Sequence, residues 1–276
     1  MQILDRVLTL LIRMPGGQSL WQKVPLGSVS TRVRYGIWNR PHYAYGVYAA
    51  ATLAKQLGKP GVTVIEFGVA GGSGLIALQE LAKTMSAELD LPIWVVGFDT
   101  GQGMPDPIDF RDLPHVWNTG FYSMDVDRLR AQLSGTQLLL GDVGDTVSEF
   151  LSNSIRFPIG FIAFDLDYYS STTKAFRVFE GLPETRLPRV YCYFDDITWP
   201  ERACHNEYTG ELGAIRDFNA RSYEKKICPI HLFRNTRPQP ETWNDQFYVL
   251  HDFSHPSYCT NITPSGDRFR QKPVMS

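Results

Sequence analysis

The sequence lacks the cysteine patterns that define several classes of protein. Its 276 residues include four cysteines, none of which forms a CxxC pair: Cys192, Cys204, Cys228 and Cys259. No zinc ribbon or thiol redox motif is readable from this spacing, and four cysteines in so long a chain do not resemble a disulfide framework. We therefore expect a reducing, cytoplasmic setting. Because Cys192 lies in an apolar run, we expect it to be a buried small hydrophobic residue.

A strong net charge and a long apolar run are also missing. The formal net charge is -2, which gives no general attraction for nucleic acid, so no nucleic-acid partner is expected. No G-x-S-x-G sequence is present, and a serine hydrolase therefore has little support. The apolar segment Met1–Ile12 is interrupted by Asp5 and Arg6 and is too short to cross a bilayer, so no membrane span is expected.

The same N-terminal segment has apolar residues at helical spacing, namely Ile3, Leu4, Val7, Leu8, Leu11 and Ile12. This pattern predicts an amphipathic helix that packs on its own domain or on a second subunit, which would make the protein a homo-oligomer. Attachment of this helix to a membrane surface is the alternative.

The chain contains short apolar runs that alternate with amphipathic stretches. Hydrophobic residues make up 43% and charged residues 20%, so a sizeable core is possible. The runs that predict strands are Val62–Phe67, Ile93–Phe98, Gln137–Leu140, Ile159–Phe164, Val190–Phe194, Lys226–Leu232 and Gln246–Leu250. The stretches that predict helices are Tyr43–Leu57, Gly74–Glu88, Val126–Leu133, Thr146–Ser152, Ser171–Phe179 and Glu211–Ala220. This alternation predicts a doubly wound α/β fold with a mainly parallel seven-stranded sheet and an N-terminal helical extension.

The domain organisation follows from where this alternation begins and ends. We expect a helical segment over residues 1–60 that acts as a lid or an oligomer contact, an α/β domain over 61–252, and an irregular tail over 253–276. Two long aromatic connections, Gly101–Ser123 and Trp199–Gly210, interrupt the pattern. Long loops in compact domains are typically functional, so we interpret both as lids.

A glycine-rich loop follows the first predicted strand, between Glu66 and Gly74. Glycines such as Gly68 let a ligand approach the backbone closely, and the next helix offers free N–H groups at its start. The run that begins Gly72-Ser73 fits G-x-G-x-x-A, which binds dinucleotides. Alternatively, Glu66-x-Gly68 matches the acidic and glycine signature of methyltransferases, and the loop then contacts the methionine end of S-adenosylmethionine. A plain tight turn is the third interpretation.

Acidic residues follow the next two strands as well. Asp99 ends the second strand, which is the usual position of an acid that binds ribose hydroxyls of either NAD or S-adenosylmethionine. Asp142 follows the third strand, where an acid can accept a hydrogen bond from an adenine amino group. Asp142 is equally interpretable as a turn or helix-cap residue.

The acids after strands four and five carry more information. Asp165, Asp195 and Asp196 would converge if those strands are neighbours, and three carboxylates brought together need a cation or must bind protons. Oxygen ligands favour a hard ion such as Mg²⁺. Asp167 could stay free of the metal and act as general base for a substrate hydroxyl whose pKa the metal lowers. Helix capping by Asp195 and Asp196 is the structural alternative, but it does not explain both acidic pairs.

These segments together resemble the macrocin O-methyltransferase family. The resemblance covers roughly residues 62–200 and rests on Ile65-Glu66-Phe67-Gly68-Val69, Gly97-Phe98-Asp99-Thr100, Gly141-Asp142, Asp165-Leu166-Asp167-Tyr168-Tyr169-Ser170-Ser171-Thr172 and Asp195-Asp196, in that order. The family consists of class I methyltransferases that act on hydroxyls of antibiotic sugars and related natural products.

The resemblance implies a role for each of these acids. Glu66, Gly68, Asp99 and Asp142 would hold S-adenosylmethionine, with Gly72 and Ser73 in the same loop. Asp195 and Asp196 would hold Mg²⁺ together with Asp165, which we expect to border the cofactor as well. Asp167 would be the catalytic base.

Three other functions remain open at this point. A nucleotide-sugar glycosyltransferase would use Asp-x-Asp as a metal–diphosphate motif, although it has no need of the glycine loop. An NAD(P)-dependent oxidoreductase is favoured by G-x-G-x-x-A and Asp99, but it leaves the acids after strands four and five unexplained. A non-catalytic S-adenosylmethionine-binding protein is the third, because a fold does not settle a function.

Overall fold

A seven-stranded sheet forms the centre of the computed structural model, which describes residues 12, 14, 16–24, 26–153 and 155–263. The strands are β1 (Val62–Phe67), β2 (Ile93–Asp99), β3 (Gln137–Leu140), β4 (Ile159–Phe164), β5 (Arg186–Phe194), β6 (Lys225–Pro229) and β7 (Phe247–Asp252). Their order across the sheet is β3-β2-β1-β4-β5-β7-β6. The first five strands run parallel, whereas β7 is antiparallel to both β5 and β6.

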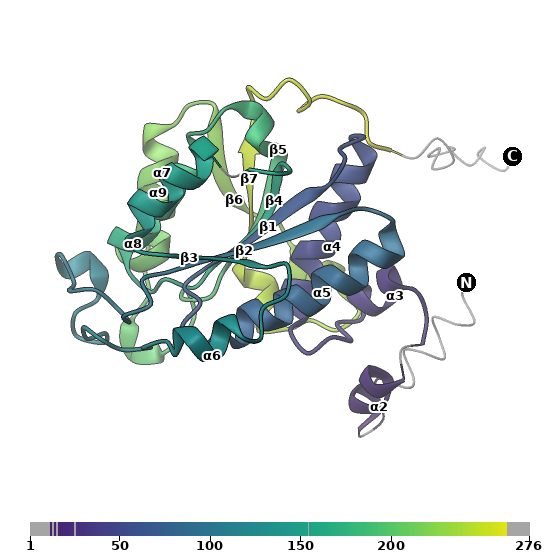
Figure 1. Cartoon of the computed structure of the whole chain (residues 1–276), viewed down its shortest axis with the longest axis horizontal. Coiled ribbons are helices and arrows are strands. Elements are labelled where there is room, and N and C mark those ends of the chain that lie inside the picture. The colour runs from purple at the N-terminus through teal and green to yellow at the C-terminus, as the bar shows by residue number, and fades with distance from the viewer. Residues whose placement is uncertain (1–11, 13, 15, 25, 154, 264–276) are drawn as a thin grey trace, which may run out of the picture.

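Helices cover both faces of this sheet (Figure 1). The helices α4 (Pro41–Gln56) and α5 (Ser73–Leu89) lie on one face, and α7 (Val143–Asn153), α8 (Tyr169–Ala175) and α9 (Gly210–Arg221) lie on the other. The described residues also form the helices α2 (Gly17–Lys23), α3 (Val29–Arg34) and α6 (Val126–Arg130). Short 3-10 turns occur at Phe110–Asp112, Phe176–Phe179, Pro183–Thr185, Glu201–Ala203, Phe233–Thr236 and Thr242–Gln246. None of the helices in the described ranges is both long and apolar enough to cross a membrane.

The central strands are apolar because both of their faces are covered. Every residue of β1 and β4 is buried, and each strand contributes to a hydrophobic cluster on either side of the sheet. A parallel strand buried in this way needs a continuous apolar run rather than an alternating one. The doubly wound, mainly parallel sheet expected from the sequence is thus confirmed.

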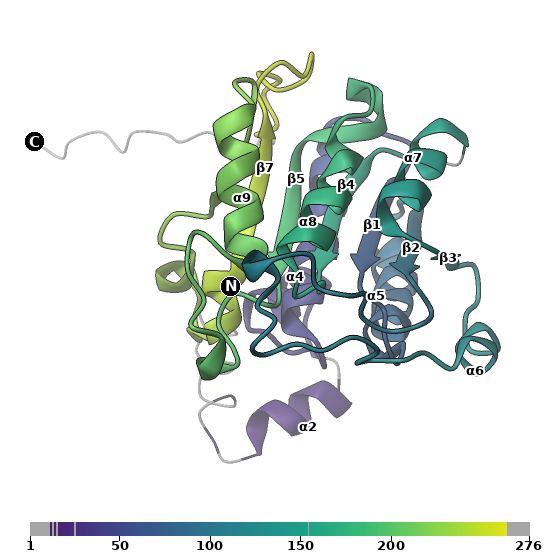
Figure 2. The ribbon, with the colours of Figure 1, turned by 90° about the vertical axis from the view of Figure 1, so that its left-hand side faces the viewer.

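The chain reverses its direction of growth between β1 and β4. From β1 it builds outward through β2 to β3, and it then returns to place β4 on the other side of β1. In open α/β sheets, the crevice at such a switch point, beyond the carboxyl ends of the strands, is where ligands bind. Figure 2 shows β1, β2 and β4 pointing toward one edge, where the long loop after β2 runs.

The expected domain limits remain a prediction. The helix α4, which belongs to the expected segment 1–60, packs directly on β4 and β5 and completes one layer of the α/β unit. Of the apolar residues expected to form an N-terminal helix, only Ile12 falls within the described residues, and it is buried beside Trp21 and Tyr35. The rest of that helix and the tail from residue 264 onward lie outside the described part of the chain.

Candidate functional site

A cavity of about 570 Å³ opens at the carboxyl edge of the parallel strands. This size is typical of a site for a small molecule or cofactor. Its lining comes from the strand ends of β1 to β5, the loop after β2, and the starts of α7 and α8. Seven of the sequence-predicted site residues line it, namely Gly68, Asp99, Asp142, Asp165, Asp167, Asp195 and Asp196.

Gly68 lets the ends of β1 and β4 approach one another at the floor of the cavity. Its φ angle is +83°, and a Cβ at this position would collide with the carbonyl oxygen of Asp165. Residues other than glycine are strained at such angles, so both the conformation and the space require glycine here. The loop then continues through Ala70, which also has a positive φ of 47°.

The carboxylate of Asp99 holds the glycine loop in place. Its Oδ2 accepts hydrogen bonds from the backbone N–H groups of Val69 and Ala70, both at 2.9 Å, and its Oδ1 accepts from the N–H of Gly101 at 2.6 Å. Asp99 therefore joins the loop after β1 to the loop after β2 while it lines the cavity.

Glu66 lies behind the glycine loop and not in the cavity lining. Its side chain is fully buried, and its Oε1 accepts a hydrogen bond of 2.5 Å from the hydroxyl of Tyr43 on α4. Its Oε2 has no hydrogen-bond partner. Burial raises the pKa of Glu66 to about 8, although the bond from Tyr43 opposes the rise. Gly72 and Ser73 are likewise absent from the lining.

Asp142 both lines the cavity and stabilises the start of α7. Its Oδ1 accepts a bond of 2.8 Å from the N–H of Gly144, and its Oδ2 lies 2.6 Å from the ammonium of Lys174 on α8. The hydrogen bond from Lys174 lowers the pKa of Asp142, so this carboxylate is ionised at neutral pH. Two sequence interpretations, a turn residue and a ligand contact, are therefore compatible here.

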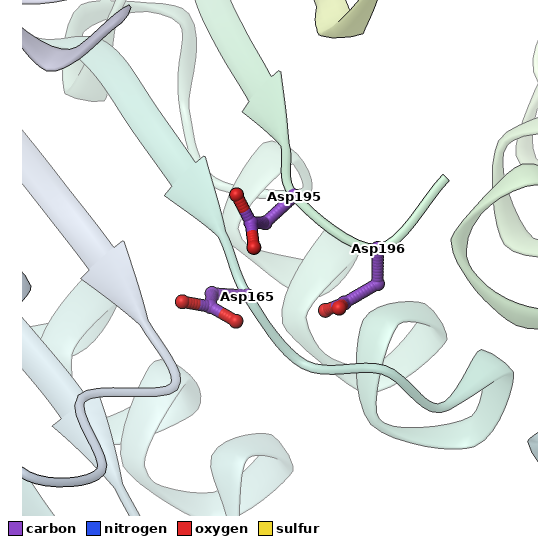
Figure 3. A group of neighbouring side chains, drawn as sticks. All are labelled: Asp165, Asp195 and Asp196. Carbon is purple, nitrogen blue, oxygen red and sulfur yellow. The ribbon is translucent and has the colours of Figure 1, made fainter. Parts of the chain in front are cut away.

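Three carboxylates meet at the ends of the neighbouring strands β4 and β5. Oxygens of Asp165, Asp195 and Asp196 lie within 4.8 Å of one another. Figure 3 shows the three side chains facing a shared space from the two strand ends. Burial and the charges of the neighbouring acids raise the pKa of Asp165 and Asp196 well above the usual range. A cation between them would relieve this repulsion.

Asp167 lies beside this cluster in a strained backbone conformation. Its φ angle is +57°, and its N–H donates a hydrogen bond of 2.9 Å to Oδ2 of Asp196. Non-glycine residues in this region are uncommon and often occur at functional sites. Burial, opposed by a hydrogen bond with Asp196, raises the pKa of Asp167 to about 7.

A fifth acid, which the sequence pattern does not indicate, bonds to the loops of the cluster. Glu211, in the first turn of α9, is fully buried, and its Oε2 accepts a bond of 3.2 Å from the N–H of Asp196. Its Oε1 lies 3.5 Å from the N–H of Leu166. Glu211 thus joins the loops after β4 and β5. Burial raises its pKa as well. Its position in an ordinary amphipathic stretch gives no local signal.

Aromatic side chains form the outer wall of the cavity. Trp117 and Tyr122 come from the long loop after β2, and Trp199 comes from the loop after β5. Trp199 is 69% exposed and Tyr122 is 52% exposed, so both offer ring faces to an incoming molecule. Both loops were expected from the sequence to be lids, and both border the cavity.

The whole fold is similar to solved structures of two O-methyltransferases. One is the calicheamicin methyltransferase CalS11, with 22% identity, 89% of this chain and 90% of that chain covered, and a TM-score of 0.51. The other is the O-methyltransferase NovP, with 15% identity, 90% and 98% covered, and a TM-score of 0.50. No protein family model matches the sequence, and no curated protein matches it either. The chain therefore has the Rossmann-like fold of class I methyltransferases.

Proposed function

We propose that the protein is an S-adenosylmethionine-dependent and Mg²⁺-dependent O-methyltransferase that acts on a hydroxyl of a small molecule. The observation that carries this proposal is the meeting of Asp165, Asp195 and Asp196 beside Asp167, at one end of a cavity floored by the glycine loop. A methyltransferase needs a donor site, an acceptor site and a group that removes the acceptor's proton. The similarity of the fold to the folds of CalS11 and NovP also supports a methyltransferase.

The donor would occupy the part of the cavity between the glycine loop and α7. Gly68 leaves space for its sulfur end, Asp99 is placed to accept from ribose hydroxyls, and Asp142 is placed to accept from the adenine amino group. Asp165 would border both donor and metal. Glu66, Gly72 and Ser73 would act on the donor through the shape of the loop, since they do not line the cavity.

The three clustered carboxylates fit a Mg²⁺ ion. They offer only oxygen ligands within 4.8 Å of one another, and their mutual repulsion is relieved by a divalent charge. Asp165, Asp195 and Asp196 would hold the ion. When bound, it would lower the pKa of the acceptor hydroxyl and help to orient it.

The remaining chemistry falls to the protein's own residues. Asp167 would accept the hydroxyl proton while the acceptor oxygen bonds to the methyl carbon and the carbon–sulfur bond breaks, which leaves a neutral thioether. The cavity walls would hold the two substrates in line, and such positioning supplies much of the rate of a two-substrate reaction. Glu211 would fix the loops that carry Asp167 and Asp196.

The aromatic residues of the cavity lining suggest which kind of molecule is methylated. Trp117, Tyr122 and Trp199 line the cavity, and the rings of Tyr122 and Trp199 are exposed, which suits a ring-bearing acceptor such as a sugar or another natural product. This agrees with the resemblance to the macrocin O-methyltransferase family, which stays a proposal.

A thermal-shift panel tests the proposed function against its alternatives. The ligands are S-adenosylhomocysteine, NAD⁺, NADP⁺ and UDP, each with and without Mg²⁺. A ligand that binds only the folded protein raises the melting temperature, so S-adenosylhomocysteine alone should do so. A rise with NAD⁺ or NADP⁺ would indicate an oxidoreductase, and a metal-dependent rise with UDP a glycosyltransferase. Binding of S-adenosylhomocysteine with no methyl transfer to any hydroxyl acceptor would indicate a non-catalytic binding protein.

A further inference from the structure

The three acids of the cluster differ in how far they are exposed to solvent. Asp196 is buried and Asp165 is half-buried, whereas Asp195 is exposed. An exposed aspartate side chain is free to rotate, and ordering it costs conformational entropy. The carboxylate of Asp195 nevertheless reaches from the end of β5 toward Asp165 (Figure 3). A contact that fixes this one side chain therefore determines whether the three carboxylates stay together.

Tyr193 makes that contact with Asp195. Its hydroxyl donates a hydrogen bond of 2.8 Å to Oδ1 of Asp195, and no other described residue donates to this carboxylate. Side chains two positions apart along a strand point to the same face of the sheet, so the spacing itself brings the two groups together. A carboxylate has about four lone-pair sites on its two oxygens, so Oδ2 and part of Oδ1 remain available to a further partner.

The ring of Tyr193 is a rigid support for this hydrogen bond. The ring is buried and stacks on His42, with the two ring centroids 4.5 Å apart. On another side, its centroid lies 5.7 Å from that of Phe247. Because His42 belongs to α4 and Phe247 to β7, two further elements enclose the ring. The hydroxyl is therefore held in a fixed position beside the end of β5.

Gln246 fixes the backbone of the same aspartate. Its Nε2 donates hydrogen bonds to the backbone carbonyl oxygens of Phe194, at 3.2 Å, and of Asp195, at 2.8 Å. Its Oε1 lies 3.4 Å from the hydroxyl oxygen of Tyr193. The hydroxyl has a single proton, and the oxygen of Asp195 is the closer and the charged acceptor, so the proton is directed to Asp195. Both the backbone and the side chain of Asp195 are thus held from behind the cavity.

We propose that Tyr193 is a positioning residue that holds Asp195 in the orientation in which it shares a divalent cation with Asp165 and Asp196, an inference that rests on the proposed function. The entropy cost of ordering Asp195 is then met when the protein folds and not when the ion binds. Hydrogen-bond partners of metal-binding side chains contribute roughly 10- to 100-fold to metal affinity. Tyr193 does not line the cavity, so it acts only through Asp195.

A purely structural Tyr193 makes a different prediction. In that role its ring only fills the space between α4 and the sheet, and its hydroxyl bonds to the nearest acceptor. Loss of the hydroxyl would then change the free energy of unfolding and leave the affinity for a cation unchanged. The affinity for the ion, measured without turnover, therefore separates the two roles.

The test measures the binding of Mn²⁺, which prefers oxygen ligands as Mg²⁺ does, to the wild type and to Tyr193→Phe. The electron paramagnetic resonance signal of free Mn²⁺ gives the affinity. The substitution keeps the ring and should weaken Mn²⁺ binding roughly 10- to 100-fold. The Mg²⁺ concentration for half-maximal activity should rise by a similar factor. Because a saturating ion orders Asp195 in either protein, kcat at saturating Mg²⁺ should change less than about twofold.

Tyr191→Phe is the matched control. Tyr191 lies two residues earlier on the same strand and loses the same hydroxyl, but it makes no hydrogen bond to the acids of the cluster. Its Mn²⁺ affinity should equal that of the wild type. A second comparison uses the Asp195→Ala background, in which Tyr193→Phe should cause no further loss because its acceptor is gone. Water proton relaxation follows the weaker Mn²⁺ binding of these two proteins.

Three results overturn the inference alone. They are an unchanged Mn²⁺ affinity in Tyr193→Phe, an equal loss in Tyr191→Phe, and an undiminished effect of Tyr193→Phe in the Asp195→Ala background. An affinity for S-adenosylhomocysteine like that of the wild type shows that each variant is folded. If the wild type itself binds no Mn²⁺, the metal dependence of the proposed function fails first and the inference fails with it.

Discussion

Asp167 is the residue that removes the proton from the acceptor hydroxyl in the proposed reaction. Replacing it by Asn keeps the shape and tolerates the positive φ, but removes the base. We expect kcat to fall by roughly 10²- to 10⁴-fold with any hydroxyl acceptor that the wild type methylates. Affinity for S-adenosylhomocysteine should change less than about twofold, since Asp167 lies on the acceptor side.

The control for this substitution is Asp109→Asn. Asp109 lies on the loop after β2, where it pairs with Arg111. Steady-state kinetics gives kcat, and calorimetry gives the affinity for S-adenosylhomocysteine, for both variants. A kcat of Asp167→Asn equal to that of Asp109→Asn would remove Asp167 from the mechanism.

Because His42 is buried, we expect the free energy of unfolding of the protein to depend on pH. Burial, together with the positive charge of Arg40, lowers its pKa to about 3, while its ring stacks on Tyr193 with centroids 4.5 Å apart. The unfolded chain binds a proton at this residue below about pH 6.5, but the folded protein does not. The contribution to stability is therefore present above about pH 6.5 and is lost as the pH falls toward 3.

Urea unfolding of the wild type and of His42→Phe measures this contribution. The substitution keeps an aromatic ring against Tyr193 and removes the titration. Between about pH 6 and pH 4, the wild-type free energy of unfolding should fall more steeply than that of the variant, by up to about 1.4 kcal/mol per pH unit. The exposed His231→Phe is the matched control. Parallel curves for the wild type and His42→Phe would contradict the burial argument.

The acids of the site were predictable because each comes directly after an apolar run. Parallel strands carry their carboxyl ends to one edge, so Asp165, Asp195 and Asp196 meet once β4 and β5 are neighbours. Glu211 was not predictable, because it reaches the cluster from a helix 15 residues after Asp196 in the chain. The inward position of Glu66 also depends on packing against Tyr43, which a strand pattern does not reveal.

At the scale of elements, α4 packs closely on β4 at Gly46. A Cβ at this position would overlap the ring of the fully buried Phe161. Although Ala favours helices by about 1 kcal/mol over Gly, we expect Gly46→Ala to destabilise the protein by about 1–3 kcal/mol through overpacking.

A double-mutant cycle with Phe161→Val isolates this contact. Val lacks the ring carbons that the new methyl group would meet, so Gly46→Ala should be less destabilising in the Phe161→Val background. Urea unfolding of the four proteins gives the coupling. Additive free energies, or stabilisation by Gly46→Ala alone, would show that α4 does not lie this close to β4.

The elements themselves were predicted more accurately than their ends. The limits of β1, β3 and β4 agree with their apolar runs. Every residue of β1 and β4 is buried, whereas the residues of β3, at the edge of the sheet, are half-buried. The strand β5 begins at Arg186, four residues before the predicted Val190, since Arg186 is buried in an ion pair with Asp252 of β7. A hydrophobic pattern cannot indicate that a charged residue belongs to a strand when the partner that neutralises its charge lies 66 residues away in the chain.

At the scale of the whole molecule, the reactivity of the four cysteine thiols shows which of these positions are buried. Cys192 is buried in β5, as its apolar context predicted, whereas Cys204, Cys228 and Cys259 are free and exposed. Burial also raises the pKa of the Cys192 thiol, so it contains little reactive thiolate. We expect three thiols to react with a disulfide reagent in the native protein, and the fourth only after unfolding. Four fast thiols, or fewer than three, would contradict this arrangement.

The central claim concerns the switch-point cavity as a whole, namely that it binds the methyl donor. Ser171 of α8 lines this cavity and is only half-buried, so Ser171→Trp fills the space without removing core contacts. Calorimetric titration with S-adenosylhomocysteine should show binding to the wild type and a loss of roughly tenfold or more in the variant, with the ligand-free melting temperature unchanged. Absence of binding to the wild type, or equal affinity in Ser171→Trp, would contradict the account.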